Sequence, residues 1–392
     1  MTETAPAQAG RRILGAALTD KPAARKAPVA GICGFDGCPR EQQHRITQPG
    51  ALLENGRLRE AGYSFSPLLR YARKDVGAAK WRIKEWDYYL VNDGCMAFAI
   101  TVSDLGYLGL LSASVLDFEQ GLFITESSIV PLTLGSFRMP EDSDEGVIEC
   151  GDSRVQVRIA ASGTVRDIKV TFRGFADGKT LSAHITLDEP PSDSMVIATP
   201  WAGKDRAFYF NRKIIGMRAR GSIQLGSQIH GFSPDDALGL LDWGRGVWTY
   251  DNTWFWGAAQ GRVTDASGRR RLFGMNIGYG FGDTSAASEN MLFCDGRATK
   301  LGRLDFGIPV RDGFYDLMEP WRMRDDAGML DLTFTPDIDR ADHTHAGPIL
   351  TDQHQVFGLY DGRVSIEGED GGPVTLEVKG LRGFAEVVHN KY

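Results

Sequence analysis

From about residue 80 onward, the chain alternates apolar and polar positions in short runs that end at turn-forming residues. Residues 153–161 (SRVQVRIAA) alternate strictly, and residues 167–175 (DIKVTFRGF) repeat the pattern. Residues 81–91 (WRIKEWDYYLV) are rich in aromatic and β-branched side chains and end at Asn-Asp-Gly, which is a hairpin signal. Because each run follows its neighbour through a short turn, we expect antiparallel strands; parallel strands would need long crossovers.

The second half of the chain has the same style of strands and turns, with a spacing of roughly 8–12 residues that is typical of sandwiches and barrels. We therefore predict an all-β fold of two antiparallel barrel-like lobes, because closure removes exposed sheet edges. A boundary near residues 198–203 (ATPWAG) gives lobes over residues 29–200 and 201–392. Residues 1–28 are rich in alanine, proline and charge without periodicity, which predicts a disordered tail.

A short helix is expected at residues 233–241 (SPDDALGLL), just before the most distinctive segment of the chain. Ser233 can cap this helix and Pro234 suits its first turn. Asp235 and Asp236 would favour the positive end of the helix dipole. The prediction therefore rests on capping chemistry rather than on length.

The distinctive segment, residues 241–257 (LDWGRGVWTYDNTWFWG), holds four of the eight tryptophans. Alternate residues of a strand share a face. One face of an extended segment would carry Trp248, Tyr250, Asn252, Trp254 and Trp256. Asp251 would then point to the other face, and only a bulge at residues 251–253 would bring its carboxyl to the indole rings.

Composition and charge narrow the class of protein. A formal net charge of −7 argues against a nucleic-acid partner, because phosphate binding needs a basic face. The sequence contains no apolar run of about 18 residues, so we expect no integral membrane segment. The N-terminus also lacks a secretory signal pattern. Five cysteines without such a signal predict reduced thiols and a cytoplasmic location. Cys33 and Cys38 lie near His44, but a zinc site needs four ligands, so we interpret the pair as free thiols.

The tryptophan-rich segment suggests acid–base chemistry beside aromatic rings. A carboxyl held against apolar rings has a raised pKa and can deliver a proton near neutral pH. Protonation of an alkene would give a carbocation that aromatic faces stabilise, and attack by water or by an internal group would make a hydratase or a cyclase. Asp251 is the expected donor, and Arg245 would oppose this role if it paired with Asp251. The alternative is structural, because aromatic side chains in β-proteins most often pack the core.

Two further pairs of polar residues are open to a catalytic or a structural interpretation. Glu85 and Asp87 share a strand face, which suggests paired-carboxylate chemistry or ion pairs with Arg82 or Lys84. Glu289 and Asn290 precede an apolar run, where they would orient a ligand or satisfy a loop backbone.

Metal and cofactor signals are weak. His343 and His345 form an H-x-H pair with His354 nearby, but they lie in a segment that is interpreted as a polar loop, so no metal is expected. A dinucleotide-binding G-x-G-x-x-G, a Walker lysine and a G-x-S-x-G elbow are all missing from the sequence, so no cofactor is expected.

Four motifs together resemble an uncharacterised, largely bacterial domain family over about residues 45–392. The motifs are RIKEWDYY (82–89), DWGRGVWTYDNTWFWG (242–257), ASENMLFCDG (287–296) and GFAEV (383–387). More distantly, Trp248, Asp251 and Trp254, with the Gly-aromatic-x-Glu ending at Glu386, resemble the lipocalin-like double-barrel proteins typified by carotenoid 1,2-hydratase and the AttH proteins.

The distant resemblance implies two lipocalin-like lobes with a hydrophobic pocket, in a group that acts on isoprenoid- or polyketide-like substrates. The hydratase pattern has a Tyr, an Asp, a His and a Trp near the pocket. Here Tyr250 and Asp251 are adjacent rather than separated by one residue, and His230 is followed by Gly-Phe rather than by the pattern's x-Trp.

These observations favour a cofactor-independent acid–base enzyme, of hydratase, cyclase or isomerase type, whose partner is a hydrophobic small molecule. The alternatives are a non-catalytic carrier of a lipid or other hydrophobic ligand and a carbohydrate-binding protein in which tryptophans stack on sugars. The expected catalytic residues are Asp251, Tyr250, Glu289 and His230. The expected ligand-binding residues are Trp86, Trp248, Trp254, Trp256, Arg245 and Asn290.

Overall fold

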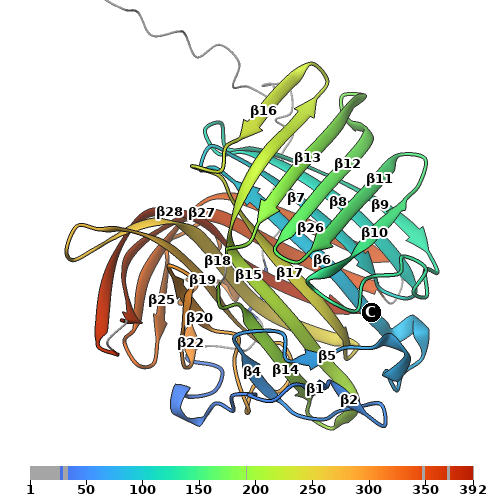
Figure 1. Ribbon diagram of the computed structural model, residues 1–392. Coiled ribbons are helices and arrows are strands. Elements are labelled where there is room, and N and C mark those ends of the chain that lie inside the picture. Colours follow the sequence, from blue (N-terminus) through green and yellow to red (C-terminus); the bar gives the residue numbers. More distant parts are fainter. Residues whose placement is uncertain (1–26, 30–33, 191, 347–348, 369–370, 392) are drawn as a thin grey trace, which may run out of the picture.

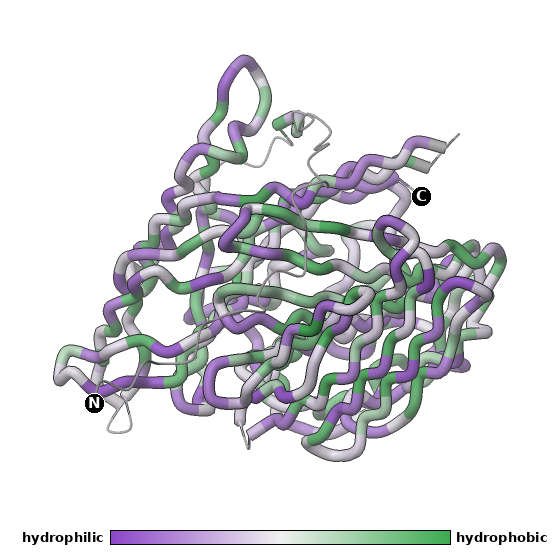
Figure 2. The backbone as a smooth tube through the Cα atoms, turned by 90° about the horizontal axis from the view of Figure 1, so that it is seen from above, coloured by the Kyte–Doolittle hydropathy of each residue, from purple (hydrophilic) through white to green (hydrophobic). Residues whose placement is uncertain are grey.

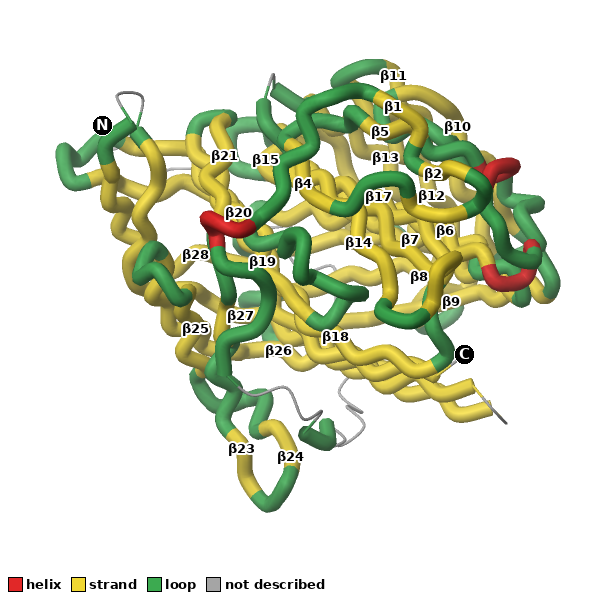
Figure 3. The backbone as a smooth tube through the Cα atoms, turned by 90° about the horizontal axis from the view of Figure 1, so that it is seen from below, coloured by secondary structure: helices red, strands yellow, loops and turns green. Residues whose placement is uncertain are grey.

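The computed structural model describes residues 27–29, 34–190, 192–346, 349–368 and 371–391. Most of the predicted tail, and Cys33 of the thiol pair, lie outside these residues. Within them the chain is almost entirely strand and turn, and the helical pieces are single 3-10 turns at Arg40–Gln42, Arg73–Asp75 and Lys80–Arg82, drawn in red in Figure 3. None of these described turns has the length or the apolar character to cross a membrane.

The larger sheet, 13 strands over the described residues, is antiparallel throughout and makes the first lobe. Its central path runs through β10 (Glu145–Gly151), β11 (Val155–Ser162), β12 (Val165–Ala176), β13 (Lys179–Asp188), β15 (Lys204–Leu225), β17 (Leu238–Val247), β6 (Ile83–Asn92), β7 (Met96–Asp104), β8 (Leu108–Asp117) and β9 (Leu122–Pro131). The strands off this path are β4 (Gly62–Ser64), β14 (Met195–Trp201) and β16 (Gln228–Phe232).

The second sheet, nine strands over the same residues, makes the second lobe. Its order is β21 (Arg297–Lys300), β20 (Met291–Cys294), β19 (Arg270–Tyr279), β18 (Asp251–Asp265), β28 (Pro373–Lys391), β27 (Ile349–Glu367), β26 (Leu330–Ala346), β25 (Trp321–Asp325) and β22 (Leu304–Asp305). Three small pairs complete the fold, namely β1 (Gly50–Ala51) with β5 (Leu69–Arg70), β2 (Leu53–Glu54) with β3 (Arg57–Leu58), and β23 (Val310–Arg311) with β24 (Phe314–Tyr315).

Both large sheets curl into half-barrels that pack against one another (Figure 1). The predicted hairpins are present: β6 turns at residues 93–95 into β7, and β11, β12 and β13 follow one another as a meander. The prediction of an all-β fold with two lipocalin-like antiparallel lobes is therefore confirmed.

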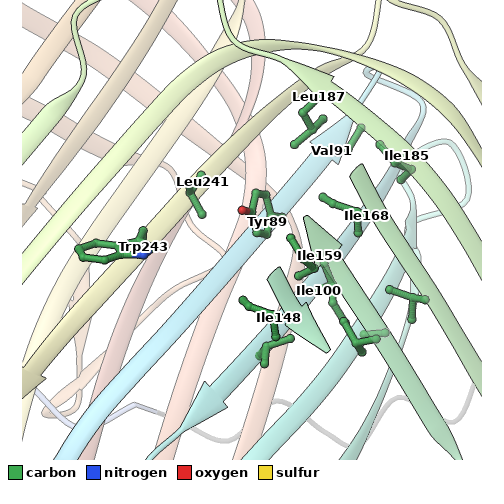
Figure 4. Close-up of a cluster of buried hydrophobic side chains, with 14 of the residues drawn as sticks. Tyr89, Val91, Ile100, Ile148, Ile159, Ile168, Ile185, Leu187, Leu241 and Trp243 are labelled. Carbon is green, nitrogen blue, oxygen red and sulfur yellow. The ribbon is translucent and has the colours of Figure 1, made fainter. Parts of the chain in front are cut away.

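Strict alternation builds the core of the first lobe. In β11, Val155, Val157 and Ile159 are buried while the residues between them are exposed, so one face packs inward and the other meets water. Figure 2 shows this change between apolar and polar positions along the strands. Figure 4 shows the resulting core, with Ile159 beside Ile148 and Ile168 and with Trp243 at its edge.

A third buried cluster lies between the two lobes, distinct from the core inside each of them. Strands β6, β15 and β17 of the first lobe contribute to it, and so do β18, β27 and β28 of the second. Strand β6 is buried along its whole length, so both of its faces are covered. One face of β6 packs against the core of the first lobe and the other face meets the second lobe.

The helix predicted at residues 233–241 is wrong. Residues 234–236 form a turn, in which the Ala237 and Asp236 amides donate to the Ser233 carbonyl, and β17 begins at Leu238. The apolar half of the segment is used in a central strand, where Leu240 faces the other lobe and Leu241 faces the first core. As a strand, this segment forms hydrogen bonds with β15 on one side and with β6 on the other. A helix this short would have to overcome an unfavourable nucleation free energy, so the strand is the more stable structure.

The chain changes sheets between Val247, the end of β17, and Asp251, the start of β18. The strands β15 and β17 therefore belong to the first sheet although they follow residue 200. The predicted division into domains at that residue stays a prediction, while the change of sheet falls inside the tryptophan-rich segment.

Candidate functional site in the polar layer between the lobes

Alternation in three strands of the first lobe places polar side chains on the face that meets the second lobe. On β15 these are Tyr209, Asn211 and Lys213, whereas Phe208 and Phe210 face the core of the first lobe. The second lobe contributes polar side chains to the same layer from β18, β19, β27 and β28. We use the name interlobe cluster for Trp86, Tyr88, Tyr209, Asn211, Lys213, Asp242, Trp254, Trp256, Asn276, Glu289, Gln355 and Glu386.

Lys213 is the cation at the centre of the interlobe cluster. Its Nζ lies 3.1 Å from Oδ1 of Asp242 and 3.8 Å from Oε2 of Glu289. The same ammonium lies 3.7 Å from the centre of the Trp256 ring. All of these groups are buried, so the charge of Lys213 is balanced by two carboxylates and an aromatic face rather than by water.

Asp242 and Glu289 are each held by further donors. The Trp86 indole nitrogen donates to Asp242 at 3.2 Å, and the Asn211 amide donates to it at 2.5 Å. The amide of Asn276 donates to Glu289 at 3.3 Å. Burial raises the pKa of Glu289, and the charge of Lys213 opposes this shift.

Glu386 is a second buried acid, carried by β28 of the second lobe. Its carboxyl accepts hydrogen bonds from the Trp254 indole at 3.0 Å and from the Gln355 amide at 3.2 Å. Burial raises the pKa of Glu386 to about 7, against the lowering effects of the Trp254 bond, Lys213 and Arg340. A carboxyl with this pKa exchanges a proton near neutral pH, which an ordinary surface glutamate does not do.

One polar atom of the first lobe faces this cluster without a hydrogen-bond partner among the described residues. This atom is Oδ1 of Asn211, which is fully buried. Tyr209, on the same strand, is almost completely buried. Burial raises the pKa of Tyr209 well above its usual range, and the nearby carboxylates of Glu289, Asp242 and Glu386 raise it further. Buried polar groups are normally paired, so Oδ1 of Asn211 is available to a ligand.

Aromatic rings line the cluster on one side. The Trp248 ring lies 4.9 Å from that of Trp86, 6.0 Å from that of Trp254 and 5.1 Å from that of Phe281. Phe281 also lies 4.3 Å from Tyr209. Trp254 is only partly buried, so the aromatic rings reach the surface there. The tryptophans predicted to share a face do share it.

Glycines of β17 give the rings their space. A Cβ atom at Gly244 would lie 1.9 Å from the Trp86 ring, so only glycine lets that ring cross the strand. A Cβ atom at Gly246 would meet the Phe208 carbonyl at 2.4 Å. The G-R-G spacing in the motif therefore serves packing of tryptophan against backbone.

The structure brings together many of the residues expected from the sequence. Trp86, Trp248, Trp254, Trp256 and Glu289 all lie in or against the interlobe cluster. Asn290 is buried beside it, but its side chain serves the backbone: it accepts from the Gly278 amide and donates to the Gly302 carbonyl.

Asp251, by contrast, lies on the other face of β18, as the regular alternation required. The strand pairs with β28 in register from Asp251 to Ala259, so the bulge that would have turned its carboxyl toward the tryptophans does not form. The side chain is 54% exposed and is bound by His389 at 2.8 Å and by Lys391 at 3.0 Å. Despite slight burial, these hydrogen bonds lower the pKa of Asp251, which is the opposite of what a proton donor needs.

Three other expected residues also lie away from the cluster. Tyr250 is exposed at the turn between the sheets. His230 is on β16, where it pairs with Asp93 at 2.7 Å. Arg245 points into the first lobe, where it pairs with Asp87 at 3.0 Å and donates to the Pro140 carbonyl at 2.8 Å. Arg245 therefore makes structural contacts within the first lobe and does not contact Asp251.

Glu85 and Asp87 are used in ion pairs, but with Arg73 and Arg245 rather than with Arg82 or Lys84. Asp87 pairs with Arg245, and Glu85 pairs with Arg73 and accepts from the Tyr71 hydroxyl at 2.8 Å. Both carboxylates face the core of the first lobe, away from Trp86.

Sequence reasoning assigned no role to Lys213, Asp242, Asn276 or Gln355, and it used Glu386 only as part of a closing motif. A signal was present for Asp242, because it is the one charge in the run LGLLDWG, and a weaker signal was present for Lys213, which stands beside Arg212 in FYFNRKIIG. A charge inside a strand that is largely apolar marks a buried polar group that needs a partner. Which partner it has depends on how distant strands pair.

Over the part of the chain that the structure describes, three or more histidine, cysteine, aspartate or glutamate side chains do not gather in a way that could hold a metal ion. The described cysteines, Cys38, Cys95, Cys150 and Cys294, form no disulfide with one another.

Residues 43–392 match the family described as a domain of unknown function, DUF2804. The chain belongs to this family. The near resemblance drawn from the four motifs is therefore confirmed, and the DUF2804 match covers both lobes.

Curated proteins give no significant match. Kievitone hydratase from Nectria haematococca is similar, with 13% identity over 78% of this chain and 88% of that chain and a TM-score of 0.47. A putative AttH protein from Nitrosomonas europaea is similar with 12% identity over 81% and 96% of the two chains and a TM-score of 0.37. A hydratase and an AttH protein are thus among the structural neighbours, as the distant resemblance implied.

Proposed function

We propose that the interlobe cluster is the active site of a cofactor-independent acid–base enzyme that acts on a hydrophobic, isoprenoid- or polyketide-like alkene as a hydratase, cyclase or isomerase. One observation carries the proposal: Glu386 is a buried carboxyl with a pKa of about 7, bound to Trp254 at the edge of an aromatic cluster. Such a group is protonated in a large fraction of molecules at neutral pH, and it lies where an apolar substrate would bind.

In this proposal Glu386 gives its proton to one carbon of the alkene, so that a C–H bond forms and positive charge develops on the other carbon. The faces of Trp248, Trp254 and Phe281 stabilise that charge through their ring quadrupoles. Trp256 is not assigned this role, because Lys213 already occupies its face.

The second half of the reaction restores the acid. In a hydratase, water forms the C–O bond and its surplus proton returns to the Glu386 carboxylate. In an isomerase, the carbocation instead loses a neighbouring proton to that carboxylate, and in a cyclase an internal alkene or hydroxyl attacks first. Asp242 and Glu289, both close to Lys213, keep the layer polar enough to hold water.

The ligand needs a polar group as well as an apolar body. Asn211 Oδ1 faces the cluster without a partner among the described residues, and a hydroxyl group on the substrate would satisfy it by donating a hydrogen bond. That hydrogen bond would also orient the alkene relative to Glu386. Among the residues expected from sequence, the tryptophans and Glu289 thus keep a place in the proposed site, while Asp251, Tyr250 and His230 do not.

Native mass spectrometry of protein purified from its own host tests the proposal, because a retained ligand identifies the substrate class. That ligand is then incubated with the protein in heavy-oxygen water and in deuterium oxide. A hydratase incorporates solvent oxygen, and an isomerase or cyclase incorporates deuterium at carbon. A retained hydrophobic ligand that gains neither isotope, at any pH at which the protein stays folded, contradicts the enzyme and supports the second candidate, a non-catalytic carrier that uses the same aromatic rings.

A further inference from the structure

The three strands that carry Trp254, Gln355 and Glu386 present a second set of residues on their opposite face, at one end of the second half-barrel. Paired positions on four neighbouring strands form a polar row: His343 on β26, Asp352 on β27, His389 on β28 and Thr253 on β18. A hollow of about 390 Å³ lies beside this row. It is lined by Ala27, Pro28, Val29, Thr253, Asp352, His354, Val387 and His389.

His354 is a buried polar residue of the hollow. Its Nδ1 lies 2.8 Å from Oδ2 of Asp339, and both side chains are at least nine-tenths buried. The bond to Asp339 holds the ring and assigns the proton to Nδ1 in the neutral imidazole, which leaves a lone pair on Nε2. Nε2 is buried and makes no hydrogen bond to a described residue; its nearest carboxylate, Asp352, is 3.8 Å away.

An imidazole fixed by a carboxylate, with its second nitrogen unpaired in a hollow, is a ready acceptor for a ligand proton. The size of the hollow is within the range of about 300–1,000 Å³ that is common for small-molecule sites. Part of the lining is apolar, because Ala27, Val29 and Val387 contribute to it. The geometry therefore suits a small ligand with one polar head.

The charged residues around the hollow determine which polar group a ligand could place there. Three carboxylates, Asp251, Asp339 and Asp352, face this end of the lobe, and they are accompanied by Lys391 and the three histidines of the row and the hollow. The three carboxylates outnumber the single lysine, which disfavours an anionic ligand and favours a hydrogen-bond donor.

We propose that this hollow is a second small-molecule site, in which the Asp339–His354 pair accepts a hydrogen bond from the hydroxyl or ammonium group of an otherwise apolar ligand. The site is separate from the interlobe cluster and does not depend on the function proposed for it, because adjacent residues of β18, β27 and β28 point to opposite faces. It gives a role to His354, which the proposed reaction leaves unused.

Histidine-ring nitrogen NMR of the full chain, at about pH 8, tests this site directly. Phenol, benzylamine and benzoate serve as the hydroxyl, ammonium and anionic probes. We expect saturable shifts of the His354 ring nitrogens with phenol, with benzylamine or with both, and the arm that saturates identifies the preferred head. The His230 ring, which is also bound to an aspartate, should not shift.

Two variants complete the test. His354→Gln should weaken binding of the effective probe by at least about tenfold, while the matched control His230→Gln should leave it unchanged. Thr253→Phe fills the hollow without touching the Asp339–His354 pair and should abolish the His354 shifts, which keeps the proposal testable if His354→Gln fails to fold. The proposal is overturned if no probe gives a saturable His354 shift, if benzoate binds as well as phenol and benzylamine, or if Thr253→Phe leaves the shifts intact.

Discussion

At the scale of single residues, the cost of burying Glu386 should be visible in stability. The pKa of this carboxyl rises to about 7 in the folded protein, because burial disfavours its charged form. The folded state thus holds the proton more tightly than the unfolded state, so the contribution of Glu386 to stability is greatest below the unfolded pKa and is lost as the pH rises toward 7. Glu386→Gln has no proton to lose. Urea unfolding should show the free energy of unfolding of the wild type falling relative to Glu386→Gln by on the order of 3 kcal/mol between about pH 4 and pH 8.

Glu119→Gln is the control for that comparison, because Glu119 is exposed and its change should leave the pH profile of the wild type unaltered. Parallel profiles for the wild type and Glu386→Gln would mean that the carboxyl is ordinary and would remove the basis for its assignment as an acid.

Lys213 supplies the positive charge that balances the buried carboxylates of Asp242 and Glu289. Lys213→Met leaves Asp242 and Glu289 buried without their cation, and loss of one partner of a buried ion pair costs about 3–5 kcal/mol. Chemical denaturation measures this loss, and the double variant Lys213→Met with Asp242→Asn should recover part of it. If the two changes simply add, the ion pair is not the reason that Lys213 is retained between the lobes.

At the scale of elements, β17 shows how glycine makes room for tryptophan. A Cβ atom at Gly244 would overlap the Trp86 ring, so Gly244→Ala should push that ring off Asp242 and cost about 3 kcal/mol. Tryptophan fluorescence and the thermal midpoint report both effects. Gly231→Ala, on β16, is the matched control, because its nearest contact would be 4.0 Å away. Equal changes for both variants would contradict this account of the glycine.

The strands could be predicted from the sequence because alternation and turn residues act locally, as at residues 153–188. The same alternation correctly put the tryptophans on one face of residues 248–256 and Asp251 on the other. The failed helix at residues 233–241 has a physical cause: its capping residues also suit a tight turn, and the competing strand pairs lie far away in the sequence. The acid at Glu386 could not be predicted as a partner of Trp254, because β18 and β28 meet only in the folded chain.

At the scale of the whole molecule, the two lobes share a buried layer. Side chains of both sheets meet in the interlobe cluster, and further bonds cross between them, such as Gly216 to the Gln260 side chain and Arg340 to Ser114. We therefore expect the lobes to unfold in one cooperative calorimetric transition, with equal calorimetric and van't Hoff enthalpies. Two resolved transitions would show that the layer contributes little to stability.

The most direct test of the central claim compares the carboxyl group of Glu386 with that of Asp251. The ligand retained by the purified protein is incubated with wild type, Glu386→Gln and Asp251→Asn, and the incorporation of solvent isotope is followed at neutral pH. Glu386 is buried against Trp254, whereas Asp251 is exposed on the other face of β18. We predict that Glu386→Gln lowers the rate by about 100-fold or more, as expected for loss of a general acid, and that Asp251→Asn keeps it. The opposite result, full activity in Glu386→Gln and loss in Asp251→Asn, would contradict the assignment of the interlobe cluster as the active site.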